Sequence, residues 1–231
     1  MFEISSTEWT AILLSLRVAI IATLVATPFG IALAWLLARR DFWGKSVLDA
    51  LVHLPLVLPP VVTGYLLLLT FGRRGLVGAW LADHLGIVFA FRWTGAALAC
   101  GVMSFPLLVR PIRLSIEAID RRLEQAASTL GAAPWRVFAT VTLPLALPGI
   151  LAGMVLGFAK AIGEFGATIT FVSNIPGETQ TISSAIYSLI QTPDGDTAAL
   201  RLVIVSTVIA MGALIASEWF ARRATKRLHG N

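Results

Sequence analysis

Charged residues are scarce in this sequence. They make up 13% of its 231 residues, whereas 57% are hydrophobic and the mean hydropathy is +0.82. A soluble domain usually has about a quarter charged residues. There is one cysteine, Cys100, so an intrachain disulfide and a cysteine-based metal site are both excluded. The shortage of charge rules out an ordinary soluble domain, and no metal site is expected.

The apolar residues fall in uncharged blocks of the length that crosses a bilayer, about 20 residues. We therefore expect an all-α polytopic membrane protein with five transmembrane helices. The expected spans are about 11–38, 50–72, 93–113, 147–172 and 200–221, in one domain at 11–219 that a basic tail, 222–231, follows. Pro55, Pro59 and Pro60 interrupt the second block, and the carbonyls they leave unpaired must meet protein or a wet cavity. Pro144 and Pro148 indicate that the fourth span begins near Leu147.

Basic residues are distributed unequally between the two sides that five crossings define. Twelve lie on one side: Arg39, Arg40, Lys45, Arg110, Arg113, Arg121, Arg122, Arg136, Arg222, Arg223, Lys226 and Arg227. Three, Arg73, Arg74 and Arg92, lie on the other. The positive-inside rule then predicts a multi-pass protein of the bacterial inner membrane, with the N-terminus outside and the C-terminus in the cytoplasm. Because the basic residues sit at the ends of apolar blocks, the net charge of +5 points to the lipid bilayer and not to nucleic acid.

The cytoplasmic connection 114–146 carries start and stop signals for two short helices. Asp120 can cap a helix over Arg121–Leu130, Gly131 can end it, and Pro134 can open a second helix toward Leu143. Charge and small residues in so structured a loop suit a surface that docks on a partner. A simple amphipathic connector would use the same signals, so the residues alone leave both readings open.

The same loop resembles a motif of ABC transporter permeases, in which Glu-Ala-Ala is followed at fixed spacing by Gly and then by Ile-x-Leu-Pro. Here the matching positions are Gln125, Ala126, Ala127, Gly131, Val141, Leu143 and Pro144. Gln125 stands in place of the acidic residue, with Glu124 beside it, and Val141 replaces isoleucine. The resemblance implies a type I ABC importer permease (MetI-like) fold. It also implies that the loop is a coupling helix seated in a groove of an ATPase subunit.

Four further segments resemble the permease subunits of molybdate ABC importers. They are Leu54–Tyr65, Gly72–Gly75, Gly163–Phe171 and Ser173–Thr181, and sulfate permeases share the general pattern. The resemblance implies uptake of molybdate by two permease copies, two ATPase copies and one extracytoplasmic binding protein that docks on the loops 72–92 and 173–199. Gly44-Lys45-Ser46 matches only the end of a phosphate-binding loop, because Arg39 stands where its first glycine belongs. We therefore expect no cofactor in this chain, with ATP and Mg²⁺ bound by the partner ATPase.

The outer half of the fourth span holds the candidates for a pore or gate: Lys160, Gly163, Glu164, Phe165 and Gly166. Ionisable residues at membrane depth are functional candidates by default. Lys160 and Glu164 are spaced i,i+4, however, so they can also simply pair with each other. Gly149, Gly153 and Gly157 form a small-residue stripe that could line a homodimer seam or pack within the subunit.

Several alternatives remain open from the sequence. A sulfate/thiosulfate or tungstate permease would share these features, since the contacts that select the oxyanion are expected in the binding protein. An ATP-independent secondary carrier could use the proline-interrupted span, although a second matching repeat is missing. The spans contain no evident Ser/His pair or carboxylate pair of the kind that a hydrolase needs. We therefore expect no catalytic residues and no enzyme. His53 is expected to be a packed or interfacial residue.

Overall fold

The structure, a computed structural model, describes residues 4–229, with side chains described up to Ala216 and at Trp219. The basic tail expected at 222–231 lies outside the described side chains. Over residues 4–229 the fold contains helices and no strand, which confirms the all-α prediction. In chain order the helices are α1 (Ser6–Arg39), α2 (Lys45–Val57), α3 (Pro60–Phe71), α4 (Leu76–Leu85), α5 (Trp93–Glu117), α6 (Arg121–Thr129), α7 (Pro134–Val137), the π segment η1 (Phe138–Thr142), α8 (Leu143–Ile162), α9 (Gly166–Val172), α10 (Ile182–Leu189) and α11 (Asp196–His229).

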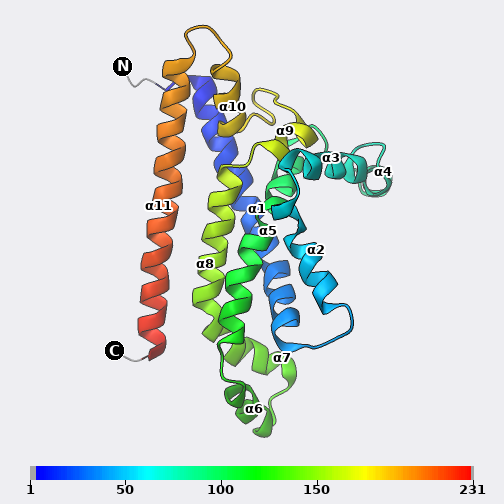
Figure 1. Cartoon of the computed structure of the whole chain (residues 1–231), viewed down its shortest axis with the longest axis vertical. Helices are drawn as coiled ribbons and strands as arrows, with labels where there is room; N and C mark the ends of the chain where they lie inside the picture. Colours follow the sequence, from blue (N-terminus) through cyan, green and yellow to red (C-terminus); the bar gives the residue numbers. More distant parts are fainter. Residues whose placement is uncertain (1–3, 230–231) are drawn as a thin grey trace.

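Long helices run side by side along one axis and form the body of the molecule (Figure 1). Within the described residues, four helices are long and apolar enough to cross a membrane: α1, α5, the continuous stretch Pro134–Ile162, and α11 over Asp196–Ala216. The pair α2 and α3 passes the same test together but bends by 114° between its two parts. Counting this pair as one broken span gives the five crossings that the sequence predicted.

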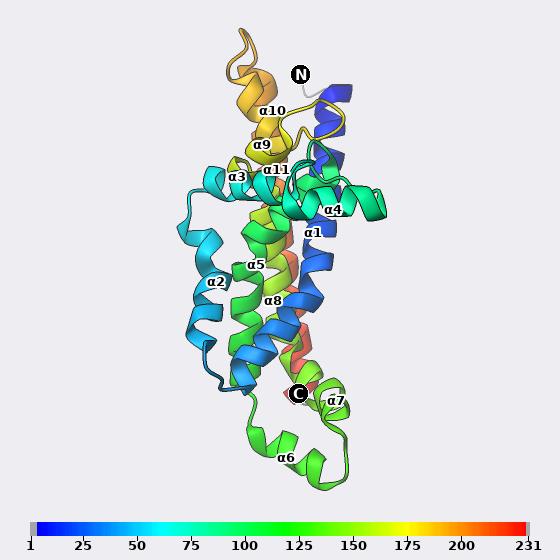
Figure 2. The same ribbon diagram turned by 90° about the vertical axis from the view of Figure 1, so that its right-hand side faces the viewer.

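The break in the second block follows from its prolines. The chain is extended at Leu58 and Pro59, and Pro60 then occupies the first turn of α3. Proline disfavours the helical conformation in the residue before it, so Leu58 and Pro59 stop α2 and Pro60 restarts a helix in a new direction. Figure 2 shows α2 rising beside the bundle and α3 crossing above it toward α4. The expected span 50–72 is thus two helices, of which α3 lies across one end of the bundle.

The fourth block also differs from its expected bounds. Helix begins at Pro134 and continues through η1 to Ile162, well before the expected start near Leu147. The amide of Leu143 donates to the carbonyl of Phe138 five residues earlier, so Pro144, which has no N–H, stands where the ladder changes register. At the other end the helix breaks at Gly163, and residues 166–172 form the separate helix α9. The expected span 147–172 is therefore two helices.

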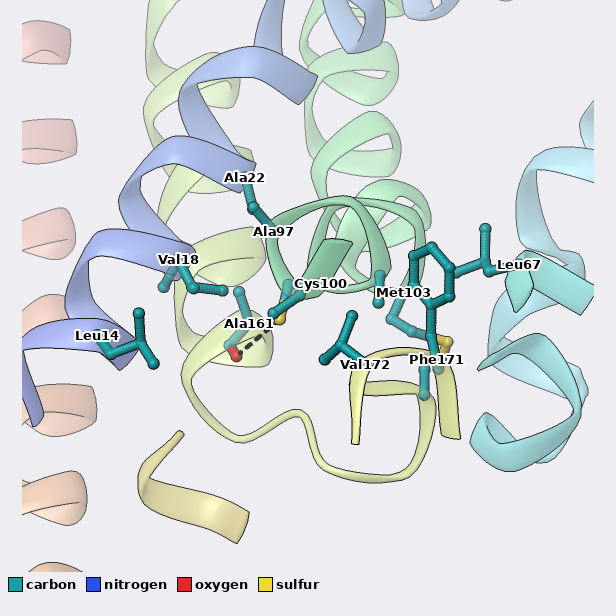
Figure 3. Packing of buried hydrophobic residues seen from close by; sticks show 14 of the residues in the cluster. Leu14, Val18, Ala22, Leu67, Ala97, Cys100, Met103, Ala161, Phe171 and Val172 are labelled. Atoms are coloured by element: carbon teal, nitrogen blue, oxygen red, sulfur yellow. Dashed lines mark hydrogen bonds between the residues drawn. The ribbon is translucent and has the colours of Figure 1, made fainter. Parts of the chain in front are cut away.

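The core lies where α1, α5 and α8 meet, and small side chains let these helices approach closely. Figure 3 shows Val18, Ala97 and Cys100 packed together, with Phe171 and Val172 of α9 beside them. Cys100 is 1% exposed and its Sγ lies 3.6 Å from the carbonyl oxygen of Ala161, as a packing residue would.

The glycine stripe of α8 faces α5 of the same chain. A Cβ at Gly153 would lie 2.5 Å from the carbonyl oxygen of Leu108, and one at Gly149 would lie 2.6 Å from that of Pro111. Both distances are too short for a real Cβ, so only glycine permits this contact between the helix backbones. Of the two roles left open by the sequence, the stripe performs packing within the subunit.

The two ends of the molecule carry different structures. The N-terminus, α10 and the crossing helices α3 and α4 lie at one end, and α6, α7 and the C-terminal end of α11 lie at the other (Figure 1). These are the same groups of segments that the count of basic residues places on opposite sides of the membrane.

Candidate functional site

The loop between α5 and α8 forms a projection at one end of the bundle (Figures 1 and 2). Asp120 caps α6 by accepting a hydrogen bond from the amide of Arg122 at 2.9 Å. At the other end Gly131 has φ +85°, and the amides of Gly131 and Ala132 donate to the carbonyls of Ser128 and Ala127. This pair of bonds is the Schellman arrangement, which requires a left-handed residue at Gly131. The two-helix loop predicted from Asp120, Gly131 and Pro134 is confirmed.

The candidate coupling residues in and just after α6 are all at least partly exposed. Gln125, Ala126 and Gly131 are exposed and Ala127 is partly exposed. Three large apolar side chains accompany them on the loop: Leu123, Leu130 and Trp135 are 51%, 89% and 66% exposed. Exposed apolar side chains clustered on a projecting loop are typical of a surface that binds another protein.

Leu143 and Pro144 occupy a different place from the α6 residues. They form the first turn of α8, directly after η1, with Leu143 partly buried and Pro144 exposed. Leu143 packs against the cluster around Ile112 and Ile116 of α5. These two positions thus lie where the loop joins the membrane helix, and their role in coupling stays a prediction.

Glu124 binds the loop to the helical body, a role the sequence reasoning did not assign. Its carboxylate lies 3.0 Å from Nε of Arg39 at the end of α1 and accepts a hydrogen bond of 2.6 Å from the hydroxyl of Thr142 in η1. Arg39 also donates through Nη2 to the carbonyl of Ile119 at 3.3 Å. The only sign of this role in the sequence was the acidic residue beside Gln125. The partners of Glu124 are 85 and 18 residues away in the chain.

At the C-terminal end of α8, Lys160 and Glu164 pair directly. Lys160 Nζ lies 2.7 Å from Oε2 of Glu164, and Oε1 of Glu164 accepts a hydrogen bond of 2.9 Å from the amide of Ala167. The Glu164 side chain is 1% exposed and that of Lys160 is 29% exposed. Glu164 therefore joins the end of α8 to the first turn of α9, and its negative charge is met by a cation and a helix N-terminus.

The remaining candidates, Gly163, Phe165 and Gly166, form the turn between α8 and α9. A Cβ at Gly166 would lie 2.7 Å from Cβ of Pro60, so α9 packs closely against the start of α3. Phe165 contacts Tyr187 of α10, with ring centroids 4.9 Å apart. A Cβ at Gly163 would have contacts no shorter than 3.9 Å, which is ordinary packing. The structure thus brings all five membrane candidates together at the junction of α8, α9 and α3.

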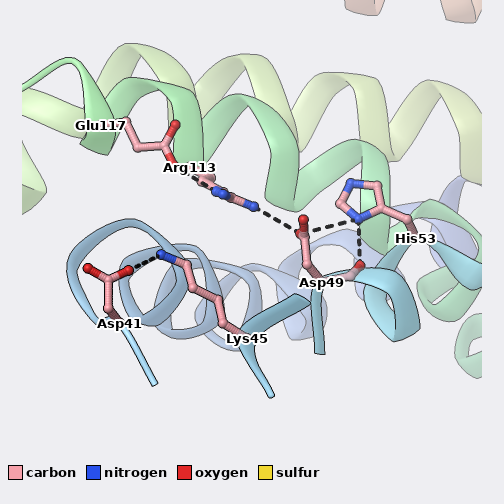
Figure 4. Close-up of polar contacts among 6 residues, drawn as sticks. All are labelled: Asp41, Lys45, Asp49, His53, Arg113 and Glu117. Atoms are coloured by element: carbon pink, nitrogen blue, oxygen red, sulfur yellow. Dashed lines mark hydrogen bonds and ion pairs between the residues drawn. The ribbon is translucent and has the colours of Figure 1, made fainter. Parts of the chain in front are cut away.

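Helix α2 is joined to α5 by a group of charged side chains, Asp49, His53, Arg113 and Glu117, here called the Arg113 cluster (Figure 4). Arg113 lies 2.9 Å from Asp49 through Nη1 and 2.8 Å from Glu117 through Nε. His53 Nδ1 lies 2.8 Å from the carbonyl oxygen of Asp49 and 3.5 Å from its carboxylate. His53 is thus partly exposed and has a local partner within α2.

Lys45, the first residue of α2, donates to Asp41 at 2.8 Å. This hydrogen bond lowers the pKa of the Asp41 carboxyl below its ordinary value. The carboxylate is 92% exposed, so the pair contributes little to stability. Among the described residues, no group of three or more His, Cys, Asp or Glu side chains could hold a metal ion.

Two cavities border these features. One, of about 690 Å³, lies between α1, α2 and α5 and is lined by apolar side chains with Thr94 as its polar member. An anion would gain little there, because nothing in that lining replaces its hydration. The other, of about 510 Å³, lies under the loop, and Arg39, Glu124 and Thr142 are among its lining residues.

A helical membrane bundle with a projecting two-helix loop is the architecture of an ABC importer permease, and residues 26–226 match the family described as binding-protein-dependent transport system inner membrane component. The chain belongs to this family. It is 63% identical over 220 residues to the molybdenum transport system permease protein ModB of Escherichia coli (strain K12), covering 95% of this chain and 96% of that protein. It is 57% identical to ModB of Haemophilus influenzae, with 96% of each chain covered.

Solved structures agree on the fold. The chain resembles a bacterial alginate ABC transporter solved with an alginate pentasaccharide-bound periplasmic protein, with a TM-score of 0.75 at 21% identity over 96% of this chain and 81% of the other. The MetNI methionine ABC transporter in an inward-facing conformation gives a TM-score of 0.65 at 14% identity, over 96% and 99% of the two chains. The predicted MetI-like fold is confirmed.

Proposed function

We propose that this chain is the membrane-spanning permease subunit of an ATP-driven importer that takes up molybdate. The observation that carries the proposal is 63% identity to a molybdenum transport permease over 95% of the chain. The aligned length covers nearly the whole chain, which supports a shared function as well as a shared fold.

Two ATPase subunits would dock on two permease copies, one on the loop of each copy. The accessibility of Gln125, Ala126 and Ala127 in α6 and of Gly131 just after it supports this assignment, as do the exposed Leu130 and Trp135 nearby. ATP and Mg²⁺ would bind the ATPase chain, and this chain would catalyse no reaction. Closure of the ATPase pair would push on the loops and shift the bundle between inward-open and outward-open states.

An extracytoplasmic binding protein would deliver the oxyanion at the opposite end. The surfaces proposed for it are the connection 72–92, which includes α4, and residues 173–199, which include α10. Both lie at the end of the bundle away from α6 (Figure 1). This arrangement supports an N-terminus outside and a C-terminus in the cytoplasm.

The α8–α9 junction is the proposed gate region. Lys160, Gly163, Glu164, Phe165 and Gly166 lie in a turn that contacts both α3 and α10, so a shift of either helix would move them. The Lys160 charge is already balanced by Glu164 at 2.7 Å. A permease must release its cargo, and a neutralised pair offers an anion no deep electrostatic well.

Uptake of labelled molybdate tests the function. Cells that lack this chain and cells in which it is restored are compared at low molybdate, with excess sulfate as competitor and with ATP depletion as control. We expect uptake that requires the chain and ATP and resists sulfate. Uptake indifferent to ATP would instead indicate a secondary carrier.

Sulfate is the second candidate cargo, because the chain is also 35% identical to a probable sulfate transport system permease protein, cysT, of Anthoceros angustus. Thiosulfate and tungstate are tested as competitors in the same uptake experiment. Loss of molybdate uptake under excess sulfate would favour sulfate, and the same loss under excess tungstate would extend the cargo to tungstate.

A further inference from the structure

The cytoplasmic loop is fixed to the bundle by polar contacts at one carboxylate. Both oxygens of Glu124 are used: one accepts the Thr142 hydroxyl at 2.6 Å, and the group lies 3.0 Å from Nε of Arg39. Arg39 ends α1, Glu124 lies in α6, and Thr142 ends η1. We call Glu124, Arg39 and Thr142 the Glu124 junction.

Packing does little to hold α6 in place. Each of its nine residues is at least partly exposed. An amphipathic surface helix normally buries one apolar face, and that burial fixes its position. Here Leu123 is 51% exposed. The position of α6 must therefore come from its flanking turns and from the Glu124 junction.

The junction is shielded enough for its contacts to matter. The side chains of Arg39 and Glu124 are 9% and 18% exposed, and Thr142 is 1% exposed. Ion pairs in fully exposed positions contribute little because water and salt screen them. When one partner of a shielded ion pair is removed, the charge of the other partner is left unpaired, and this destabilises the contact.

The junction also meets the membrane helices at a distinctive point. Thr142 belongs to a single π turn inside the helix Pro134–Ile162, and single π turns are frequent at functional sites. The hydroxyl of Thr142 reaches α6, while the backbone of Thr142 continues directly into α8. A displacement of α6 is thus passed to α8 through Thr142 and to α1 through Arg39.

We infer that Glu124, held by Arg39 and Thr142, is a positioning residue that makes the coupling helix α6 move as one body with the cytoplasmic ends of α1 and α8. The inference deepens the proposed function and rests on it. It separates two tasks within the loop: the exposed residues Gln125 to Gly131 bind the ATPase, whereas Glu124 faces inward and transmits the movement.

The test uses the whole importer, with permease, ATPase and binding protein reconstituted in liposomes. Molybdate uptake and ATP hydrolysis are measured on the same vesicles for Glu124→Gln, Thr142→Val and the wild type. Asp41→Asn is the matched control, because it removes from an ion pair at the same end of the molecule a carboxylate side chain that is 92% exposed. We expect Glu124→Gln to retain its ATPase subunits and to hydrolyse ATP, while molybdate transported per ATP falls at least about fivefold, the lower range of typical coupling between sites. Thr142→Val should show a smaller loss, and Asp41→Asn none.

An exchange of charges guards against a variant that simply misfolds. Arg39→Glu and Glu124→Arg should each lower transport per ATP, and the double variant should recover a large part of it. Glu124→Gln with the wild-type ratio of transport to hydrolysis would overturn the inference. So would loss of the ATPase subunits from Glu124→Gln during purification, because Glu124 would then serve docking. If the wild-type importer itself takes up no molybdate, the proposed function fails and not the inference.

Discussion

Gly64 of α3 and Ala167 of α9 lie backbone against backbone. A Cβ at Gly64 would stand 2.5 Å from the carbonyl oxygen of Ala167 and 2.9 Å from its Cα, distances that a real side chain does not reach. The two residues are more than 100 positions apart in the chain, yet they join the broken second span to the helix that follows the break in the fourth. The junction of α3 and α9 thus depends on the absence of a side chain at one position.

Gly64→Ala should destabilise this junction. The added methyl group has backbone on its far side, so α3 and α9 must separate, and overpacking of this kind costs about 1–3 kcal/mol. The thermal unfolding midpoint of the purified permease in detergent measures the loss. Gly212→Ala in α11 is the control, since a Cβ there would meet no described heavy atom within 4 Å. Equal midpoints for the two variants would contradict the close contact.

Substitution of Gly131 should weaken the docking loop through the backbone. Gly131 has φ +85°, which costs a residue with a side chain about 1–2 kcal/mol, and a β-branched residue suffers most. We expect Gly131→Val to reduce the amount of ATPase that co-purifies, or its coupling to uptake, while membrane insertion is unchanged. Gly131→Asn should retain more function, since asparagine tolerates this conformation. Uptake by Gly131→Val equal to that of the wild type would remove Gly131 from the coupling residues.

Lys160→Met alone should destabilise the α8–α9 junction more than the double variant Lys160→Met/Glu164→Gln does. Without the ammonium group, the carboxylate of Glu164 would stay 99% buried with one compensating amide. Removing one member of a fully buried pair costs about 3–5 kcal/mol. Because Lys160 is 29% exposed, we expect roughly 1–3 kcal/mol. Thermal unfolding of Lys160→Met, Glu164→Gln and the double variant is the measurement, and additive losses would show that the two residues do not interact.

The same variants address the gate. If the junction acts in gating, Glu164→Gln keeps near-normal stability but loses uptake, because the amide retains a hydrogen bond while the charge is gone. Normal uptake by a stable Glu164→Gln would show that the pair of Lys160 and Glu164 stabilises the junction and has no role in gating.

Arg113→Ala should loosen α2. This helix buries Val52 alone among its described residues, and Arg113 ties it to α5 through Asp49 at 2.9 Å. Partly exposed ion pairs are worth up to about 1 kcal/mol, so α2 should open locally without global unfolding. Hydrogen exchange over residues 49–57 should accelerate in Arg113→Ala and stay unchanged in Lys45→Gln, which loses an exposed pair. Unchanged exchange in both variants would show that apolar packing holds α2.

Local chemistry was sufficient to predict the loop from the sequence. An N-cap, a left-handed glycine and a proline in a first turn act within four residues of where they stand, so Asp120, Gly131 and Pro134 could be interpreted without tertiary contacts. The uncharged blocks likewise identified the membrane helices, because the bilayer sets their length.

Directions and long-range partners could not be predicted in this way. Pro59 and Pro60 signalled an interruption, but the 114° turn is set by the packing of α3 on α9. The break at Gly163 has no proline to announce it. Glu124 is visible in the sequence beside Gln125, but its role depends on Arg39, which lies 85 residues earlier in the chain.

The shape of the docking loop is set within the single chain before any partner arrives. The Asp120 cap, the turn at Gly131 and the Glu124 junction give α6 a defined orientation although none of its nine residues is fully buried. A partner that meets a segment already ordered loses less conformational entropy on binding than one that must fold it. An ATPase subunit that docks on this loop, as proposed, would therefore lose little conformational entropy in ordering it.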